Sequence, residues 1–393
     1  MSNIHTWRKD TPGCQMYTHL NNAGASYPPQ IVVDTICQYL QQESLRGGYE
    51  IHALRNEEIS GFYTAVAKLL NAQARNIAFV GSATDAFARA MNSIPFEKGD
   101  IILTTMQDYA ANQISYLSMI KRLGIELIRV PNAPEGDLDL TEMEAAIKKH
   151  QPKLVSISHV PTNSGLVQPI EEVGKLCQKY EVLYLVDACQ SAGQMPLDVE
   201  KIACDFLMSA FRKWMRGPRG TGFLYVSNKV LQKGYSPVCL DGGGAMWTNE
   251  NEYQLADSAL RYQFWELNYG LVLGAKVAAE YALEVGLGNI EKRVLELATY
   301  TRQQLASKLG ATIQDKGVRQ CGIVTASFEK IELSKLTNHL MKNQVNVSFA
   351  QRNHAVIDMD DKGIDWALRV SPHYYNTKEE IDYLVKIMEE FLG

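Results

Sequence analysis

Lys213 is the residue of this chain whose surroundings are most suggestive of covalent chemistry. It stands in FRKWMRGPRGTG, a glycine-rich stretch that follows the apolar run CDFLMSA. A lysine on such a loop, with basic neighbours and apolar surroundings, can have a lowered pKa and act as a nucleophile. The alternative is a solvated surface lysine, the usual situation of this residue. Trp214 and Met215 follow directly and argue against that alternative.

Two further segments place polar or aromatic side chains directly after apolar runs. Asp187 ends VLYLVD, and Gln190 lies three residues on. A carboxylate at this point can face the positively charged nitrogen of a bound ring, or it can simply cap a helix. Tyr109 follows DIILTT and can place its aromatic face over a flat ring. An ordinary core or surface tyrosine is the alternative.

A fourth segment, NIAFVGSATDAFARAM, changes from an apolar run to a helical pattern through the turn GSAT. The free amides and the positive dipole end of a helix that begins near Thr84 form a natural phosphate site. The alternative is an ordinary helix start capped by Thr84 or Ser82. The segment matches neither the Walker loop nor the GxGxxG fingerprint.

Together the four segments supply a phosphate site, an aromatic lid, a partner for a pyridinium nitrogen and a lysine able to form a Schiff base. Pyridoxal 5'-phosphate requires this set. All four follow apolar runs, and in an open α/β sheet ligands gather beyond the carboxyl ends of the strands. The residues therefore predict a pyridoxal-phosphate site at one edge of a sheet.

The elements that must position these residues alternate between β-prone and helical patterns. The predicted strands are apolar throughout, which is typical of strands buried on both faces of a mainly parallel sheet. They lie at 76–80, 100–105, 153–160, 182–187, 204–210 and 222–227. A long helical region follows from about residue 267, and the later strands are expected at 322–328, 345–350 and 367–372.

The change of pattern predicts an α/β protein of two domains. We expect an N-terminal segment at 1–19, a large α/β domain with a mainly parallel sheet at 20–285, and a smaller α+β domain at 286–393. A chain of 393 residues can bury cores of this size without disulfides or metals.

Composition excludes several classes of protein. The chain is 46% hydrophobic with a net charge of −5, which gives no electrostatic basis for binding nucleic acid or anionic lipid. It has no apolar run of transmembrane length and no secretory signal pattern, so a cytoplasmic location is expected. The seven cysteines are scattered and odd in number, without CxxC or HExxH, which favours reduced thiols over disulfides and predicts no metal site.

Five longer motifs occur in an order that is known from one family. The chain resembles the class V aminotransferase family of fold-type I pyridoxal-phosphate enzymes, which includes cysteine desulfurases, selenocysteine lyase, kynureninase and isopenicillin N epimerase. It is most similar to the epimerase-like branch. The motifs are THLNNAGASYPP (18–29), HVPTNSGLVQPI (159–170), RKWMRGPRGTGFLYV (212–226), RYQFWE (261–266) and LRVSPHYYNTKEEID (368–382).

The resemblance implies roles for the residues around the cofactor ring. Lys213 matches the lysine that forms the internal aldimine, and Asp187 matches the aspartate that keeps the pyridine nitrogen protonated. Gln190 matches the residue that bonds the ring hydroxyl. Tyr109 falls where the family places its stacking histidine or aromatic residue, and Thr162 falls where many relatives carry an asparagine near the ring.

It also implies contacts to the phosphate and to the substrate. Ala83 and Thr84 match the phosphate-binding turn, and Arg212 replaces a common histidine and can pair with the phosphate. Arg369 matches the arginine that clamps the substrate α-carboxylate. The remaining implied contacts are a phosphate contact from Ser209, because Ala210 replaces the usual hydroxyl residue, and substrate side-chain contacts near Asn22 and Tyr49.

The reaction is predicted from a departure from the family. Sulfur-mobilising desulfurases carry a persulfide-forming cysteine in the segment that corresponds to 347–363, and this chain has none there. A persulfide-relay cysteine desulfurase is therefore disfavoured. We expect β-elimination (C–S lysis) of a cysteine-like or S-substituted cysteine substrate through an external aldimine and a quinonoid. Epimerisation (or racemisation) and transamination are the alternatives.

The resemblance further implies a homodimer with active sites between the subunits. The segments at 240–249 and 263–266 are the candidates for the contact with the partner's site. A flexible glycine loop is the alternative for the first of them.

Overall fold

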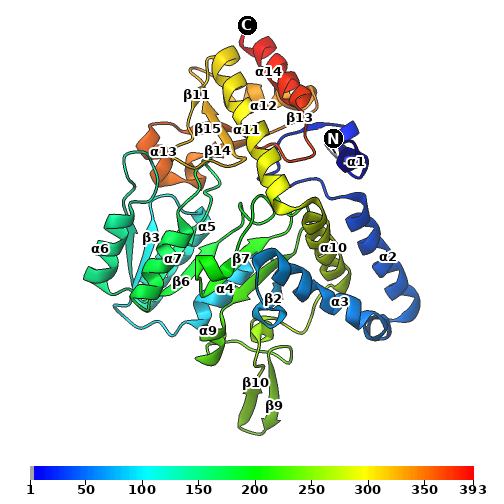
Figure 1. Cartoon of the computed structure of the whole chain (residues 1–393), viewed down its shortest axis with the longest axis vertical. Helices are drawn as coiled ribbons and strands as arrows, with labels where there is room; N and C mark the ends of the chain where they lie inside the picture. The colour runs from blue at the N-terminus through cyan, green and yellow to red at the C-terminus, as the bar shows by residue number, and fades with distance from the viewer. Residues whose placement is uncertain (1–3) are drawn as a thin grey trace.

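The computed structural model describes residues 4–393, and a seven-stranded sheet lies at its centre (Figure 1). The strand order is β2-β8-β7-β6-β5-β3-β4. The strands from β7 to β4 are parallel to one another, whereas β8 runs antiparallel to both β7 and β2. The bounds are β2 (Ile77–Val80), β3 (Ile101–Thr105), β4 (Glu126–Val130), β5 (Leu154–Ser158), β6 (Leu183–Asp187), β7 (Phe206–Ala210) and β8 (Gly222–Val226). The predicted α/β fold with a mainly parallel sheet is confirmed.

Helices cover both faces of this sheet, which explains why its strands are apolar throughout. Successive side chains of a strand point to opposite faces, so Ile77 and Phe79 belong to one core and Ala78 and Val80 to the other. The first core is closed by α2 (Gln30–Arg46), α3 (Gly48–Leu70), α6 (Leu140–His150), α7 (Ile170–Lys179), α8 (Val199–Ile202) and α10 (Tyr269–Val285). The second is closed by α4 (Ala83–Ser93), α5 (Ala110–Leu123) and α9 (Asn228–Gln232).

Strand β4 is the one strand of this sheet that the sequence did not predict. It reads ELIRV and is only partly buried, because it lies at the edge of the sheet. Glu126 and Arg129 interrupt this strand, so it does not give the continuous apolar run by which its neighbours were recognised.

A second, four-stranded antiparallel sheet forms the C-terminal part, in the order β11-β12-β15-β14. Helix α11 (Leu287–Leu309) leads into it, separated from α10 by Gly286, whose φ of 86° ends one helix and begins the next. The remaining elements are β11 (Thr312–Ile313), β12 (Val324–Ser327), α12 (Leu333–Lys342), β13 (Val345–Asn346), β14 (Ser348–Gln351), α13 (Val356–Lys362), β15 (Trp366–Val370) and α14 (Lys378–Leu392).

The N-terminal segment joins this C-terminal part. Helix α1 (Ile4–Lys9) precedes β1 (Thr18–His19), which pairs in parallel with β13, and Asn21 bridges to Ser371. Residues 1–3 of the predicted segment at 1–19 lie outside the described residues. The predicted boundaries at residues 20 and 286 stay predictions.

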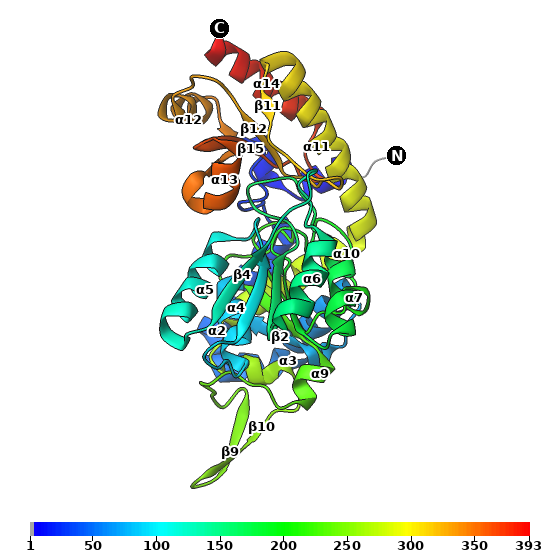
Figure 2. The same cartoon turned by 90° about the vertical axis from the view of Figure 1, so that its left-hand side faces the viewer.

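A hairpin of β9 (Ala245–Asn249) and β10 (Glu252–Leu255) projects away from the body of the molecule (Figure 2). It carries large apolar side chains into solvent: Trp247 is 78% exposed, Met246 61% and Tyr253 60%. Within residues 4–393, no helix combines the length and the apolarity that crossing a bilayer requires.

Candidate active site

Lys213 lies in the loop between β7 and β8, and its side chain is buried. Burial lowers its pKa, and the cations Arg212 and Arg369 lower it further, whereas the Cys189 thiol and Asp187 act in the opposite direction. Its Nζ is 5.8 Å from the centre of the Tyr109 ring. The alternative of a solvated surface lysine is therefore wrong, because the chain buries this amine beside a carboxylate and an aromatic face.

Asp187 is the last residue of β6 and is buried. Its Oδ1 accepts a hydrogen bond from the Cys189 amide at 2.9 Å, and its Oδ2 accepts one from the Asn112 side chain at 3.1 Å. No helix of the described chain begins at Asp187, so the helix-cap alternative does not apply. The carboxylate instead lies near enough to Lys213 to raise that lysine's pKa.

Tyr109 occupies the position just before α5. The Asp108 carboxylate fixes it there by accepting the Tyr109 amide at 2.7 Å. The phenol ring remains 37% exposed and faces the Lys213 ammonium. The arrangement is consistent with an aromatic lid, and the stacking of Tyr109 on a cofactor ring stays a prediction.

The GSAT turn leads into α4, whose first two residues are Ala83 and Thr84. The Ser82 hydroxyl caps the helix by accepting the Asp85 amide at 3.1 Å. Directly beneath this turn β8 begins at Gly222, where a Cβ would lie 2.7 Å from the Ser209 carbonyl and 3.3 Å from the Ala83 nitrogen. Only glycine allows the strand to pass so close to the helix start, where the first amides of α4 create a positive potential.

The Ser209 hydroxyl donates to the Ala188 carbonyl at 3.2 Å. It is therefore already engaged within the sheet, and its implied phosphate contact stays a prediction. The Arg212 guanidinium donates to the Gly24 carbonyl. Burial lowers the pKa of Arg212, and Arg219 lowers it further, because no carboxylate among the described residues compensates the charge.

Arg369 lies on β15 and reaches across to the large sheet. Its NH1 donates to the Thr162 carbonyl at 3.1 Å and to the Thr162 hydroxyl at 2.7 Å, and its NH2 donates to Asn21 Oδ1 at 3.3 Å. The Nε is buried and has no partner among the described residues. Burial and the nearby Arg212 lower the pKa of Arg369 to about 10, so it stays cationic at neutral pH and favours an incoming anion.

A hydrogen-bonded chain connects Arg369 to the lysine loop. The Thr162 hydroxyl also accepts from Gln190 Nε2 at 3.0 Å, and Gln190 Oε1 accepts from the Trp214 indole at 2.8 Å. The structure thus brings together the predicted residues Arg369, Thr162 and Gln190. The bond from Gln190 to a ring hydroxyl stays a prediction.

Two predicted substrate contacts are placed differently. Asn22 is fully buried, and its side chain donates to the Ser371 carbonyl at 2.8 Å and to Asn376 Oδ1 at 3.1 Å. Its neighbour Asn21 is the residue that contacts Arg369, which the sequence analysis missed. Tyr49 is 79% exposed on α3 and takes no part in the hydrogen bonds of this site.

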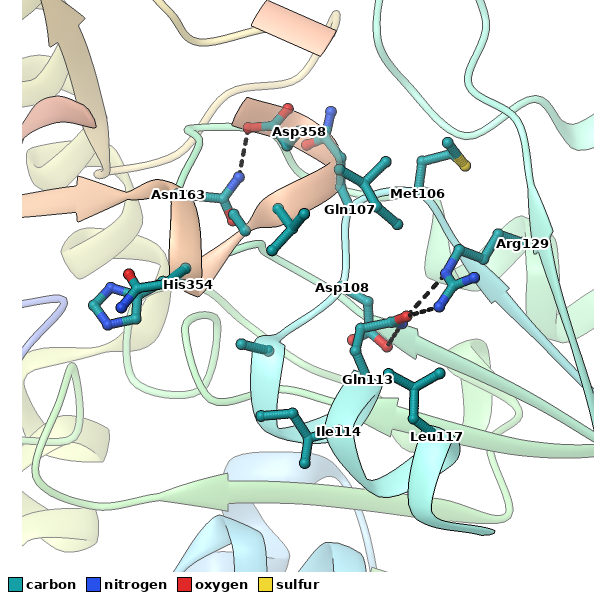
Figure 3. Close-up of a pocket in the computed structure, with 15 residues that line it drawn as sticks. Met106, Gln107, Asp108, Gln113, Ile114, Leu117, Arg129, Asn163, His354 and Asp358 are labelled. Atoms are coloured by element: carbon teal, nitrogen blue, oxygen red, sulfur yellow. Dashed lines mark hydrogen bonds between the residues drawn. The ribbon is translucent and has the colours of Figure 1, made fainter. Parts of the chain in front are cut away.

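A cavity of about 280 Å³ lies beside Tyr109, between α5 and the C-terminal part (Figure 3). Ala110, Ile114 and Leu117 form one wall, and the segment at 353–358, including His354, forms another. Asn163, which follows Thr162, donates to Asp358 at 2.6 Å and closes the cavity on that side. The lining, all of it within the described chain, contains no cysteine.

These residues fit pyridoxal phosphate on their own chemistry. Lys213 is a buried amine with a lowered pKa, Asp187 is a buried carboxylate with few donors, and the start of α4 can offer amides to a phosphate. The buried Arg369 Nε without a partner fits a substrate carboxylate.

Comparisons with known proteins identify the family of the chain. The family model described as aminotransferase class V matches residues 18–384. The chain is similar to a probable cysteine desulfurase of Pyrococcus abyssi, at 27% identity over 98% of this chain and 96% of the relative, and to one of Methanothermobacter thermautotrophicus, at 27% identity over 98% and 97%. A solved cysteine desulfurase of Thermococcus onnurineus NA1 superposes with a TM-score of 0.91 at 26% identity, over 100% of this chain and 98% of that one.

The comparisons confirm the predicted resemblance and its cofactor, and they correct the predicted reaction. β-Elimination was expected, with epimerisation and transamination as alternatives, and a persulfide-relay desulfurase was disfavoured, but these near full-length relatives are named cysteine desulfurases. The error has a physical source. The prediction depended on the missing cysteine between 347 and 363, and an acceptor thiol need not come from that segment.

Proposed function

Because the chain belongs to the class V aminotransferase family, we propose that it is a pyridoxal-phosphate-dependent cysteine desulfurase. L-cysteine and a thiol R–SH would give L-alanine and the persulfide R–S–SH. The carbon–sulfur bond of the substrate breaks, the sulfur joins the acceptor sulfur, and a proton replaces it on Cβ. The observation that carries the proposal is the similarity to proteins named cysteine desulfurase over 98% of the chain.

The residues of the site suit this reaction. Bound pyridoxal phosphate supplies an electron sink for the substrate Cα. Arg369 holds the substrate carboxylate, because its buried guanidinium has no anionic partner within residues 4–393. Lys213 removes the Cα proton and returns a proton, since burial lowers its pKa toward neutrality and makes it a competent base. Asp187 keeps the ring nitrogen protonated through its negative charge.

The acceptor thiol must be accessible and able to ionise. Cys189 lies beside Lys213, but burial and the neighbouring Asp187 raise its pKa, so this thiol stays protonated. Of the seven cysteines, Cys37 and Cys239 are exposed. We therefore propose that the sulfur passes to one of these two thiols or directly to a thiol in solution.

The reaction is tested by product analysis of the holoenzyme with L-cysteine and a reducing thiol. Alanine and sulfide in equal amounts are expected. Pyruvate and ammonia without alanine would overturn the proposed function. Lys213→Ala is the control for background chemistry of the free cofactor.

The acceptor is tested without added thiol. Intact-mass spectrometry after incubation with L-cysteine should show the gain of one sulfur atom, which Cys37→Ser or Cys239→Ser removes. If neither variant removes it, the carrier is a different cysteine of the chain. If no sulfur is gained while alanine still forms on addition of thiol, the acceptor is the thiol in solution.

We also propose a homodimer that completes the site. Exposed Trp247 and Met246 on the projecting hairpin form an apolar surface of the kind that associates. Tyr49 is exposed on α3 and is free to contact a second copy. Sedimentation velocity should show a dimer that Trp247→Glu dissociates. Val318→Glu, at a position 84% exposed outside the hairpin, is the matched control. A wild-type monomer at micromolar concentration would contradict this.

A further inference from the structure

A single amide, that of Asn112, connects two buried carboxylates behind the lysine. Its Nδ2 donates to Asp187 Oδ2 at 3.1 Å and to Asp108 Oδ1 at 3.1 Å. All three residues are at most 6% exposed. Asn112 lies on the first turn of α5, so the helix that carries Tyr109 at its start also carries this connection.

The two carboxylates differ in the number of hydrogen bonds that they accept. Asp108 accepts from the Ser158 hydroxyl at 2.6 Å, the Thr104 hydroxyl at 3.1 Å, Gln113 Nε2 at 3.0 Å and the Tyr109 amide at 2.7 Å, in addition to Asn112. Asp187 accepts only from the Cys189 amide and from Asn112 within the described residues. Asn112 therefore provides one of two donors to Asp187 and one of five to Asp108.

The orientation of the Asn112 amide is fixed by its surroundings. An amide nitrogen carries two hydrogens, and both are used, one for each carboxylate. Rotating the amide by half a turn would place its oxygen against two acceptors, which is repulsive. Asp108 is itself anchored to β3 by Thr104 and to β5 by Ser158. The position of Asp187 on β6 is thereby tied to two further strands of the sheet.

Burial is costly for both acids. Burial raises the pKa of Asp108, and the charge of Asp187 contributes to the same direction, whereas hydrogen bonds from Ser158, Asn112 and Gln113 oppose it. Two carboxylates that lie this close repel each other unless a donor is shared between them. The Asn112 amide is that shared donor.

We propose that Asn112 is a positioning residue for Asp187: it holds this carboxylate in the orientation in which it partners the ring nitrogen of pyridoxal phosphate. It does so by linking Asp187 to the Asp108 cluster, defined as Asp108 with its anchors on the sheet, Thr104 and Ser158. Without this link, Asp187 keeps one donor, is free to turn, and is repelled by Asp108.

The chain offers a matched control in the next residue. Gln113 also donates an amide hydrogen to Asp108, at 3.0 Å, but it does not contact Asp187. Figure 3 shows Gln113 between Asp108 and Arg129, which donates to Gln113 Oε1 at 2.9 Å and 2.7 Å. Asn112→Leu and Gln113→Leu both remove an amide donor from Asp108, and only the first removes one from Asp187.

The measurements are the dissociation constant of pyridoxal phosphate and the absorbance spectrum of the bound cofactor as a function of pH. Losing a hydrogen bond to a charged group predicts that Asn112→Leu weakens cofactor binding about 10-fold and shifts the pH midpoint of the spectrum. Gln113→Leu should leave both within about twofold of wild type, because it spares Asp187. Asn112→Gln, which keeps the amide, should recover part of the loss.

Equal effects of the two leucine variants on binding and on the spectrum would overturn the proposal, because the Asp108 cluster as a whole would then be responsible. An unchanged spectrum in Asn112→Leu would overturn it as well. Circular dichroism checks that each variant folds. If Asn112→Leu does not fold, Asn112→Ser, whose side chain is too short to span both carboxylates, is measured in the same way against Gln113→Leu.

Discussion

Two buried arginines, Arg216 and Arg369, are surrounded in opposite ways. Arg216 is 2% exposed, and hydrogen-bond acceptors surround its guanidinium. Its Nε donates to the Tyr27 carbonyl at 2.9 Å, NH1 to the Tyr374 hydroxyl at 2.5 Å, and NH2 to the Thr11 hydroxyl at 2.5 Å. The face of the Tyr375 ring lies 4.4 Å from its guanidinium carbon. Burial disfavours the charge, but Tyr374 and Tyr375 outweigh it, and the pKa of Arg216 is raised.

Arg369 is nearly as buried, at 8% exposed, but its guanidinium is less completely hydrogen-bonded. It donates only to Thr162 and to Asn21, its Nε has no partner among the described residues, and its pKa is lowered to about 10. Lys213 shares this condition, with a pKa lowered by burial and by its cationic neighbours.

The difference separates Arg216, whose charge is matched within the fold, from the two cations for which we propose a function. A buried charge that serves the fold is paired or fully hydrogen-bonded in the free protein. A buried charge that is left short of partners costs stability, and that cost is recovered when an anionic ligand arrives. Both kinds of buried cation occur in one loop, because Lys213 and Arg216 are three residues apart.

Lys213→Ala should give the largest effect. Turnover of L-cysteine is expected to fall more than about 1,000-fold, since the base and cofactor-linking amine are lost together. Thermal stability of the cofactor-free protein should not decrease, because the variant removes a buried charge that lacks a full set of partners. Alanine formation and differential scanning calorimetry measure the two quantities. Retained turnover would show that Lys213 does not act in the reaction.

Arg216→Met should show the reverse pattern. Its hydrogen-bond partners Tyr374 and Thr11 would be left buried without donors, so the free energy of unfolding should fall by about 3 kcal/mol. The KM for L-cysteine should stay close to wild type, because the Arg216 side chain donates to Tyr27, Tyr374 and Thr11 and not to Arg369 or Lys213. Urea unfolding and steady-state kinetics measure these. A raised KM at unchanged stability would erase the distinction between the two arginines.

Arg369→Leu tests the other arginine. The loss of a charged hydrogen-bonding partner for the substrate carboxylate should raise KM about 10- to 100-fold. Stability of the cofactor-free protein should be unchanged or higher, since an unmatched buried charge is removed. Arg369→Lys should lie in between, because lysine keeps the charge without the planar fork. A stability loss as large as that of Arg216→Met would show that Arg369 is structural.

The sequence pointed to the two cations with few partners by different routes. Lys213 follows β7, and Asp187 ends β6 beside it, where ligands gather in such a sheet, whereas Arg369 was assigned from the family resemblance. The structural role of Arg216 was not predicted, because its partners Thr11, Tyr27 and Tyr374 come from distant parts of the chain. The sequence around Arg216 does not indicate such distant partners.

Local sequence patterns also did not distinguish Asn21 from Asn22. Asn22 was expected to face the substrate, but Asn21 is the residue that contacts Arg369. Neighbouring residues in an irregular segment point in different directions, and only the pairing of Asn21 with Ser371 decides which one faces the site. The Asn112 bridge was missed because it joins α5 to β6, far apart in sequence.

His373 offers a finer test on the structural side, with the smallest expected effect. It is fully buried, it bonds the Trp214 carbonyl through Nε2 at 2.9 Å, and Nδ1 accepts the Tyr374 amide at 2.8 Å. Burial, with a further contribution from Arg216, lowers its pKa from 6.5 to about 3. Between these values the unfolded chain binds a proton that the folded chain does not, so the free energy of unfolding falls as the pH falls.

The slope that one such histidine contributes approaches about 1.4 kcal/mol per pH unit in the middle of this window. Unfolding of the cofactor-free protein in urea, measured at several pH values, should therefore show a shallower fall in His373→Gln than in wild type. His159→Gln should flatten the curve in the same way, because burial also lowers the pKa of His159 to about 3. An unaltered slope in His373→Gln would mean that the cluster around Arg216 admits a second cation, and its contrast with the Arg369 site would then be lost.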